Sequence, residues 1–300
     1  MQKKWKIYNK MATLYLSLHN RQISTTNQSF IMGIINANKN SFWKGSQFTK
    51  QKAINKALKM IDEGADILDI GAESSRPGAS YILEKEEIKA LIPIIKGIRK
   101  KSNIPISIDT RKTNVMKACF EEGADILNDI SALEDDENMA SFVAKTNINC
   151  ILMHKQGNPS TMQNNPQYSD IVNEISDYLL KRCQYGISKG ISPEKIILDA
   201  GIGFGKNLDH NKKLILSSSK ILQNVQNGLK YMGENLPKHI VMALSRKTCI
   251  GEMTFKKPEE RLAGTIAANL IAVEKGATIL RVHDVKETKD MLFVYRGLHE

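Results

Sequence analysis

Acidic residues are missing from the first 61 positions, and Asp62 is the first carboxylate in the sequence. The same stretch contains eleven of the 43 lysines and arginines, and the other 32 are balanced by 32 acidic residues between positions 62 and 300. The net charge of +11 therefore belongs to one end of the chain. Because these cations are scattered along the stretch, we interpret them as a solvated basic face and expect no nucleic-acid partner.

Cysteine is scarce and widely spaced, and the sequence has no long apolar run. No two of the four cysteines form a C-x-x-C pair, which argues against a structural zinc site and against a dense disulfide framework. We therefore expect a reducing, cytoplasmic environment. No run approaches the ~20 apolar residues of a transmembrane helix, so no membrane association is expected. The short apolar stretch from Met11 to Leu18 lacks a signal-peptide cleavage site and predicts a strand.

A phrase that recurs three times indicates alternating helices and strands. Its copies are residues 63–68 (EGADIL), 122–127 (EGADIL) and 275–280 (KGATIL). In each copy a glycine can close a helix in the left-handed conformation, and a buried apolar strand follows after two or three residues. With 300 residues, 41% of them hydrophobic and 25% charged, the chain is long enough for one large α/β domain.

Eight short apolar runs alternate with eight helical patterns, which favours a single-domain (β/α)8 barrel. The strands are predicted at 30–35, 67–70, 104–108, 126–127, 150–153, 196–198, 240–244 and 279–282. The helices are predicted at 51–63, 84–101, 112–122, 138–145, 170–189, 212–227, 258–275 and 286–298. An open doubly wound sheet is the alternative, although it usually has fewer strands. We assign residues 30–300 to the barrel and residues 1–29 to an extension that forms a hairpin over its amino-terminal end.

Polar residues follow every predicted strand, and in this fold the active site lies at the carboxyl ends of the strands. Helix capping explains Ser, Thr, Asp and Asn at such positions, but it does not explain a convergence of arginine, lysine and histidine. The side chains suited to a multiply charged anion such as pyrophosphate are Arg76, Arg281 and His283. The side chains suited to the edge of a flat, hydrogen-bonding heterocycle are Asp109, Asn128, Asp199 and Lys247.

Eight ordered motifs between Phe30 and the carboxyl end resemble those of dihydropteroate synthase. They are MGIIN (32–36), DIGAESSRPG (69–78), SIDT (107–110), NDI (128–130), LMH (152–154), GIGFGK (201–206), SRK (245–247) and RVHDV (281–285). The resemblance implies an enzyme that joins a dihydropterin methyl diphosphate to p-aminobenzoate, with loss of pyrophosphate, in folate biosynthesis. It also implies a homodimer that pairs through outer barrel helices.

The resemblance further implies three groups of site residues. Those that hold the pterin are Asp109, Asn128, Asp199 and Lys247. Those on the diphosphate side are Asn36, which would also bind Mg2+, Arg281 and His283. Those on the p-aminobenzoate side are Ser75, Arg76, Pro77, Phe204 and Thr248. Because loss of pyrophosphate leaves a delocalised pterin cation, the residues expected to be catalytic act through charge, and they are Asp109, Lys247, Arg281 and His283.

The segment after Asn36 departs from the family pattern. The family has Val-Thr-Pro-Asp-Ser-Phe-Ser-Asp-Gly-Gly, whereas residues 37–46 read ANKNSFWKGS. Lys39 replaces a proline, and Asn40 replaces a carboxylate that could stabilise a cation. Two alternatives follow, an active dihydropteroate synthase or a pterin-binding paralogue whose second substrate is lost or changed. A nucleic-acid or anionic-surface binder that uses residues 1–61 is a third, and it predicts steep salt dependence of binding.

Overall fold

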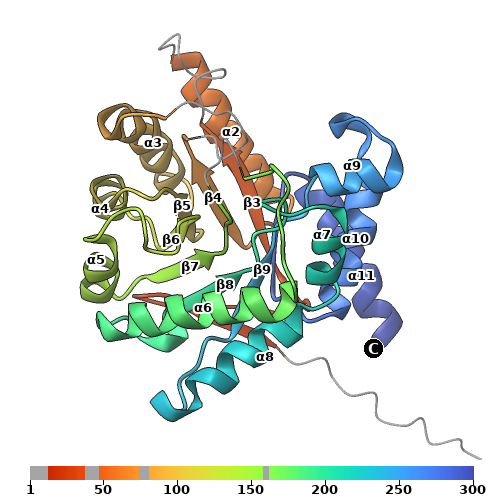
Figure 1. The fold of residues 1–300 in the computed structure, drawn as a ribbon. Helices are drawn as coiled ribbons and strands as arrows, with labels where there is room; N and C mark the ends of the chain where they lie inside the picture. The colour runs from red at the N-terminus through yellow and green to blue at the C-terminus, as the bar shows by residue number, and fades with distance from the viewer. Residues whose placement is uncertain (1–12, 38–46, 74–80, 158–161) are drawn as a thin grey trace, which may run out of the picture.

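Eight parallel strands form a closed barrel in the computed structural model, which describes residues 13–37, 47–73, 81–157 and 162–300 (Figure 1). Around the barrel the order is β10-β3-β4-β5-β6-β7-β8-β9. The strands are β3 (Phe30–Asn36), β4 (Ile67–Gly71), β5 (Ile106–Asp109), β6 (Ile126–Asp129), β7 (Asn149–Met153), β8 (Ile196–Asp199), β9 (His239–Met242) and β10 (Ile279–Val282). Every predicted strand overlaps one of them, so the predicted (β/α)8 barrel is confirmed.

The helices surround the barrel (Figure 1). They are α2 (Gln47–Asp62), α3 (Glu84–Arg99), α4 (Thr113–Glu121), α5 (Met139–Thr146), α6 (Ile171–Ser188), α7 (Leu208–Ile215), α8 (Ser218–Leu229), α9 (Thr248–Thr254), α10 (Leu262–Glu274) and α11 (Val285–His299). Short 3-10 turns are η1 (Pro193–Lys195), η2 (Lys230–Met232) and η3 (Pro258–Glu260). The recurring glycines Gly64, Gly123 and Gly276 have φ of +97°, +97° and +90°, so each adopts the left-handed conformation that its position requires.

Two helix predictions were wrong in detail, and one helix was missed. The predicted helix 212–227 is divided into α7 and α8 at Leu216 and Ser217, because the first turn of α8 docks onto a distant loop: the Ser219 N–H donates to the Lys275 carbonyl over 2.7 Å. The predicted helix 258–275 begins as η3, and α10 starts only at Leu262. The seven residues of α9 were not predicted, because so short a segment has too few turns to show a helical period.

An antiparallel hairpin, β1 (Leu14–Ser17) and β2 (Gln22–Thr25), covers the amino-terminal end of the barrel. Leu16 and Leu18 pack against the apolar side chains that fill this end of the barrel, which are Phe30, Met32, Ile67, Ile126, Ile151, Ile197, Val241 and Ile279. The Lys195 ammonium donates to the Ser17 and Leu18 carbonyls over 2.9 and 3.0 Å. A second, larger apolar core lies between the strands and the helices. Among the described residues, no helix combines the length and apolarity needed to span a membrane.

Candidate active site

Parallel pairing brings the polar ends of neighbouring strands to one level. Asn36 pairs with Gly71, Gly71 with Asp109, and Asp109 with Asn128, so four consecutive strands of the barrel end together. Asp199, the last residue of β8, pairs with Met153 at the end of β7. The barrel closure therefore gathers residues that lie more than 150 positions apart in the sequence.

Arg281 lies between two carboxylates at this end of the barrel. Its Nε donates to Asp69 Oδ2 over 2.6 Å, and its Nη2 donates to Asp109 Oδ2 over 2.9 Å. Asn128 Nδ2 lies 3.3 Å from both oxygens of Asp69, which is fully buried. Burial alone would lower the pKa of Arg281, but Asp69 and Asp109 raise it, so the guanidinium stays charged. Arg281, predicted to bind an anion, thus contacts Asp109, predicted to bind a heterocycle, so the two predicted groups of residues meet in the structure.

The pKa values of Asp109 and Lys247 are shifted in opposite directions, each toward neutral pH. Burial raises the pKa of Asp109 to about 7, although Arg281 opposes the shift. Burial lowers the pKa of Lys247 to about 8, although Asp199 opposes it. Each group can therefore change its charge near neutral pH, as groups at functional sites commonly do.

Asp199 and Lys247 are oriented by the loop that follows β8. Asp199 Oδ1 accepts a hydrogen bond of 2.7 Å from the Gly201 N–H, and the Lys247 ammonium donates to the Ile202 carbonyl over 2.5 Å. The same ammonium lies 5.0 Å from the centre of the Phe204 ring, within the range of a cation–π contact. This loop thereby connects the proposed pterin residues to one residue of the p-aminobenzoate side.

His283 begins the turn between β10 and α11 and contacts Ser245. Its N–H donates to Ser245 Oγ over 3.2 Å, and its Nδ1 lies 3.1 Å from the same oxygen. Burial, with the nearby cations Lys56 and Arg281, lowers the pKa of His283 to about 4. At neutral pH the ring is therefore uncharged, and its remaining nitrogen acts as a hydrogen-bonding group rather than as a cation.

Asn36 ends β3 with an exposed side chain at the level of Asp109. In the part of the chain that the structure describes, no three His, Cys, Asp or Glu side chains group as a metal site. A single amide oxygen still suits Mg2+, which prefers oxygen ligands, keeps several waters and takes further ligands from substrate phosphates. The donor set therefore fits a magnesium ion that binds together with a diphosphate.

The structure describes only some of the residues expected on the p-aminobenzoate side. Phe204 is half-buried next to Lys247, and Thr248 is exposed as the first residue of α9. Ser75, Arg76 and Pro77 lie outside the described residues. So do residues 38–44, which carry most of the departures from the family pattern.

Two buried residues of the site were missed at the sequence level. Asp69 interrupts the apolar run Ile67–Ile70, and a carboxylate inside a strand that is covered on both faces was the available signal. Lys206 ends the glycine-rich motif after β8; its ammonium lies 3.0 Å from His154 Nδ1 and donates to the Phe204 carbonyl over 2.9 Å. Burial lowers the pKa of Lys206 to about 7.

Comparison with known proteins matches the chain to a family described as "Pterin binding enzyme" over residues 32–283. Dihydropteroate synthase of Haemophilus influenzae is 39% identical over 268 residues, which cover 89% of this chain and 93% of that protein. Among solved structures, Xanthomonas albilineans dihydropteroate synthase with 4-aminobenzoic acid has a TM-score of 0.84 at 34% identity, covering 96% of this chain and 98% of that chain. Burkholderia cenocepacia dihydropteroate synthase complexed with 7,8-dihydropteroate has a TM-score of 0.81 at 35% identity, covering 95% and 96%.

Proposed function

Because this chain belongs to the dihydropteroate synthase family of pterin-binding enzymes, we propose that the residues at the carboxyl ends of its strands carry that reaction in named roles. The enzyme is a transferase that condenses (7,8-dihydropterin-6-yl)methyl diphosphate with p-aminobenzoate to give 7,8-dihydropteroate and pyrophosphate in folate biosynthesis. The observation that supports these roles is the buried cluster of Asp69, Arg281, Asp109 and Asn128, beside the pair of Asp199 and Lys247.

Asp109, Asn128, Asp199 and Lys247 are proposed to hold the pterin ring. A pterin presents N–H donors and N and O acceptors along one edge, and these four side chains supply the complementary carboxylate, amide and ammonium groups. As the carbon–oxygen bond to the diphosphate breaks, pyrophosphate leaves with the electron pair and the ring becomes positively charged. An ionised Asp109 next to that ring stabilises the charge, and its raised pKa falls when the cation forms.

Asn36, Arg281 and His283 are proposed to face the diphosphate. Arg281 supplies a permanent positive charge, and the neutral His283 ring supplies a hydrogen bond to a phosphate oxygen. Asn36 is the residue proposed to hold Mg2+, which when bound would neutralise negative charge on the pyrophosphate. Loss of a charged leaving group is thereby favoured without a protein nucleophile.

The amine of p-aminobenzoate is proposed to attack the exposed methylene carbon and then release a proton to solvent. Ser75, Arg76, Pro77, Phe204 and Thr248 are the residues proposed for its binding site. The Xanthomonas albilineans relative binds 4-aminobenzoic acid, which supports the assignment of the second substrate. The contact between Lys247 and Phe204 would place this substrate beside the pterin.

We also propose that the protein is a cytoplasmic homodimer. In support, α10 and α11 run side by side (Figure 1) and expose a set of apolar side chains, which are Ile271, Phe293, Val294 and Leu298. Exposed apolar side chains on neighbouring outer helices suit an interface between protein chains. All four cysteines are free thiols, as expected in a reducing compartment. Sedimentation should give a dimer for the parent and a monomer for Val294→Lys.

A steady-state assay of pyrophosphate release, with and without p-aminobenzoate, tests the function. We expect release that depends on p-aminobenzoate and on Mg2+, and a higher Mg2+ requirement for Asn36→Ala. The alternative is a pterin-binding paralogue whose second substrate is lost or changed, and the departures from the family pattern at residues 37–44 motivate it. Tight binding of the pterin diphosphate without p-aminobenzoate-dependent turnover would favour that alternative.

A further inference from the structure

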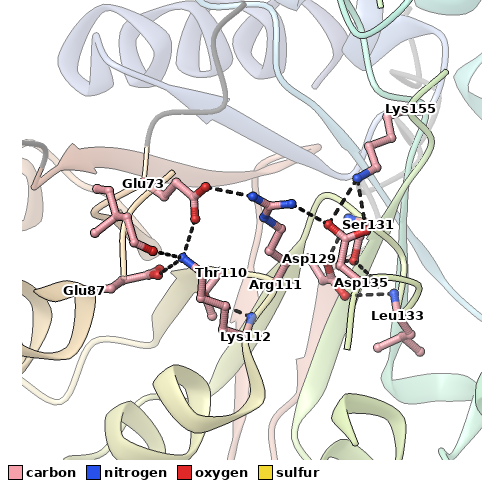
Figure 2. Close-up of polar contacts among 11 residues, drawn as sticks. Glu73, Glu87, Thr110, Arg111, Lys112, Asp129, Ser131, Leu133, Asp135 and Lys155 are labelled. Atoms are coloured by element: carbon pink, nitrogen blue, oxygen red, sulfur yellow. Dashed lines mark hydrogen bonds and ion pairs between the residues drawn. The ribbon is translucent and has the colours of Figure 1, made fainter. Parts of the chain in front are cut away.

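A buried lysine outside the proposed pterin site joins two segments of the chain. Lys112, three residues after the end of β5, is 5% exposed. Its ammonium donates to Glu73 Oε2 over 2.5 Å, to the Ile82 carbonyl over 2.7 Å and to Glu87 Oε2 over 2.7 Å (Figure 2). An ammonium has three N–H donors, so every donor of Lys112 is used.

The charges around Lys112 keep it ionised. Burial alone would lower its pKa, but the hydrogen bonds with Glu73 and Glu87 raise the pKa above the ordinary value for lysine. Glu87 lies on α3 and is fully buried. A buried ammonium that is paired in this way is difficult to move, because separating it from Glu87 leaves an uncompensated carboxylate in the interior.

The partners of Lys112 lie on both sides of residues 74–80 in the sequence. Glu73 lies two residues after β4, and Ile82 lies two residues before α3. One ammonium therefore connects the two flanks of the stretch 74–80, on which Ser75, Arg76 and Pro77 are found. The Tyr81 ring, also on the second flank, lies with its centre 4.4 Å from the same ammonium.

Glu73 is itself held from the other side. Its Oε1 accepts a hydrogen bond of 2.9 Å from Arg111 Nη2, and Arg111 Nη1 donates to Asp135 Oδ2 over 2.7 Å. Lys155, two residues after β7, lies 3.4 Å from both oxygens of Asp135. Figure 2 shows this network running from Glu87 to Lys155. Glu73, Arg111, Asp135 and Lys155 lie in the segments that follow β4, β5, β6 and β7. Both carboxylate oxygens of Glu73 are thus fixed, and so is the direction in which the chain leaves β4.

We propose that Lys112 is a positioning residue for the second substrate, because it fixes the separation and direction of the two flanks of residues 74–80. The proposal rests on the proposed function, which assigns Ser75, Arg76 and Pro77 to the p-aminobenzoate side. Lys112 touches none of the four proposed pterin residues through its ammonium. Its loss should therefore weaken the use of p-aminobenzoate and leave the binding of the pterin diphosphate unchanged.

The test is the double variant Lys112→Met/Glu87→Gln, which removes the ammonium together with the buried carboxylate that it would otherwise leave unpaired. We expect KM for p-aminobenzoate to rise about tenfold or more, with Kd for the pterin diphosphate within about twofold of the parent. Lys195→Met is the matched control. Lys195 is also 5% exposed, and its ammonium donates to two backbone carbonyls, but it lies at the opposite end of the barrel. Both substrate constants should be unchanged in the control.

Hydrogen exchange of the peptide covering residues 72–84, measured without substrates, tests the same contact independently of turnover. Exchange should be faster in the Lys112 double variant than in the parent or in Lys195→Met. If the double variant does not fold, Glu73→Gln, which weakens only one contact of Lys112, should show the same two effects at smaller size. Parental KM for p-aminobenzoate with parental exchange, or an equal loss of both substrates, would overturn the proposal. A parent without p-aminobenzoate-dependent turnover would refute the proposed function alone, since the exchange comparison still reports on Lys112.

Discussion

The two ends of the barrel are made from the same strands but differ in chemistry. At the amino end, Phe30, Ile67 and Ile126 meet Leu16 of the hairpin in a closed apolar core. At the carboxyl end, the interior holds carboxylates, an arginine and a lysine, whose burial shifts the pKa of Asp109 and Lys247 toward neutrality. Apolar burial stabilises the fold, whereas buried charge is costly unless it is paired. The difference indicates that stability is concentrated at one end and chemistry at the other.

Arg281→Ala should give the largest effect, because Arg281 serves both the proposed chemistry and the pairing of buried carboxylates. We expect kcat/KM to fall about 10³-fold or more, and the free energy of unfolding to fall by about 3–5 kcal/mol because Asp69 and Asp109 lose their partner. Steady-state kinetics and urea denaturation measure the two effects. Arg21→Ala is the control at the amino end, since its partner Asp125 keeps an ion pair of 2.8 Å with Arg99. Near-parental turnover of Arg281→Ala would show that this cluster is not part of the active site.

Lys247→Ala should separate chemistry from stability at the carboxyl end. We expect kcat/KM to fall about 10²- to 10³-fold. The fold should be kept, because Asp199 retains its hydrogen bond from the Gly201 N–H. Circular dichroism and steady-state kinetics check both points. A folded variant with parental kinetics would contradict the role of Lys247 at the pterin.

Leu16→Ala, at the amino end, should lower stability and leave turnover unchanged, the opposite of Lys247→Ala. Leu16 is almost fully buried in the hairpin–barrel core, so truncation should lower the free energy of unfolding by about 3 kcal/mol. The substrate constants should not change at a temperature at which the variant stays folded. Urea denaturation with parallel kinetics measures the effect, and a selective loss of turnover would show that the two ends are not independent.

His239 should give the smallest effect, a pH dependence of stability at the amino end. Burial lowers its folded pKa to about 4, below the value of 6.5 expected in the unfolded chain. The unfolded state therefore binds the proton first, so this contribution to stability is complete above pH 6.5 and is lost as the pH falls toward 4. The free energy of unfolding should fall by about 1 kcal/mol between pH 7 and pH 5.5 from this group. His239→Gln should show a correspondingly shallower pH dependence in urea denaturation; an unchanged profile would contradict the assignment.

Much of the fold, and of the set of polar residues at the carboxyl ends of the strands, is predictable from local signals. Glycines such as Gly64 and Gly123 mark where helices close, and apolar runs of two to six residues mark the strands. Other features were invisible because they depend on distant contacts. The helical period runs through Leu216 and Ser217 without a break, and the division there follows from the bond between Ser219 and Lys275. Asp69 stood in the sequence as a lone carboxylate, and its partners come from β6 and β10.

The sequence by itself determines the eight-unit barrel, the end of the strands that carries the polar residues and the family to which the motifs belong, because periodicity, turn chemistry and motif order are local properties. Only the tertiary structure decides which charges meet. Closing the barrel brings β10 beside β3 and sets Arg281 between Asp69 and Asp109, and the loops after β4 and β5 bring Lys112 to Glu73 and Ile82. The physical reason is that the pairing and the pKa of a buried charge depend on its distance to other charges and on its removal from water, and both are set by packing.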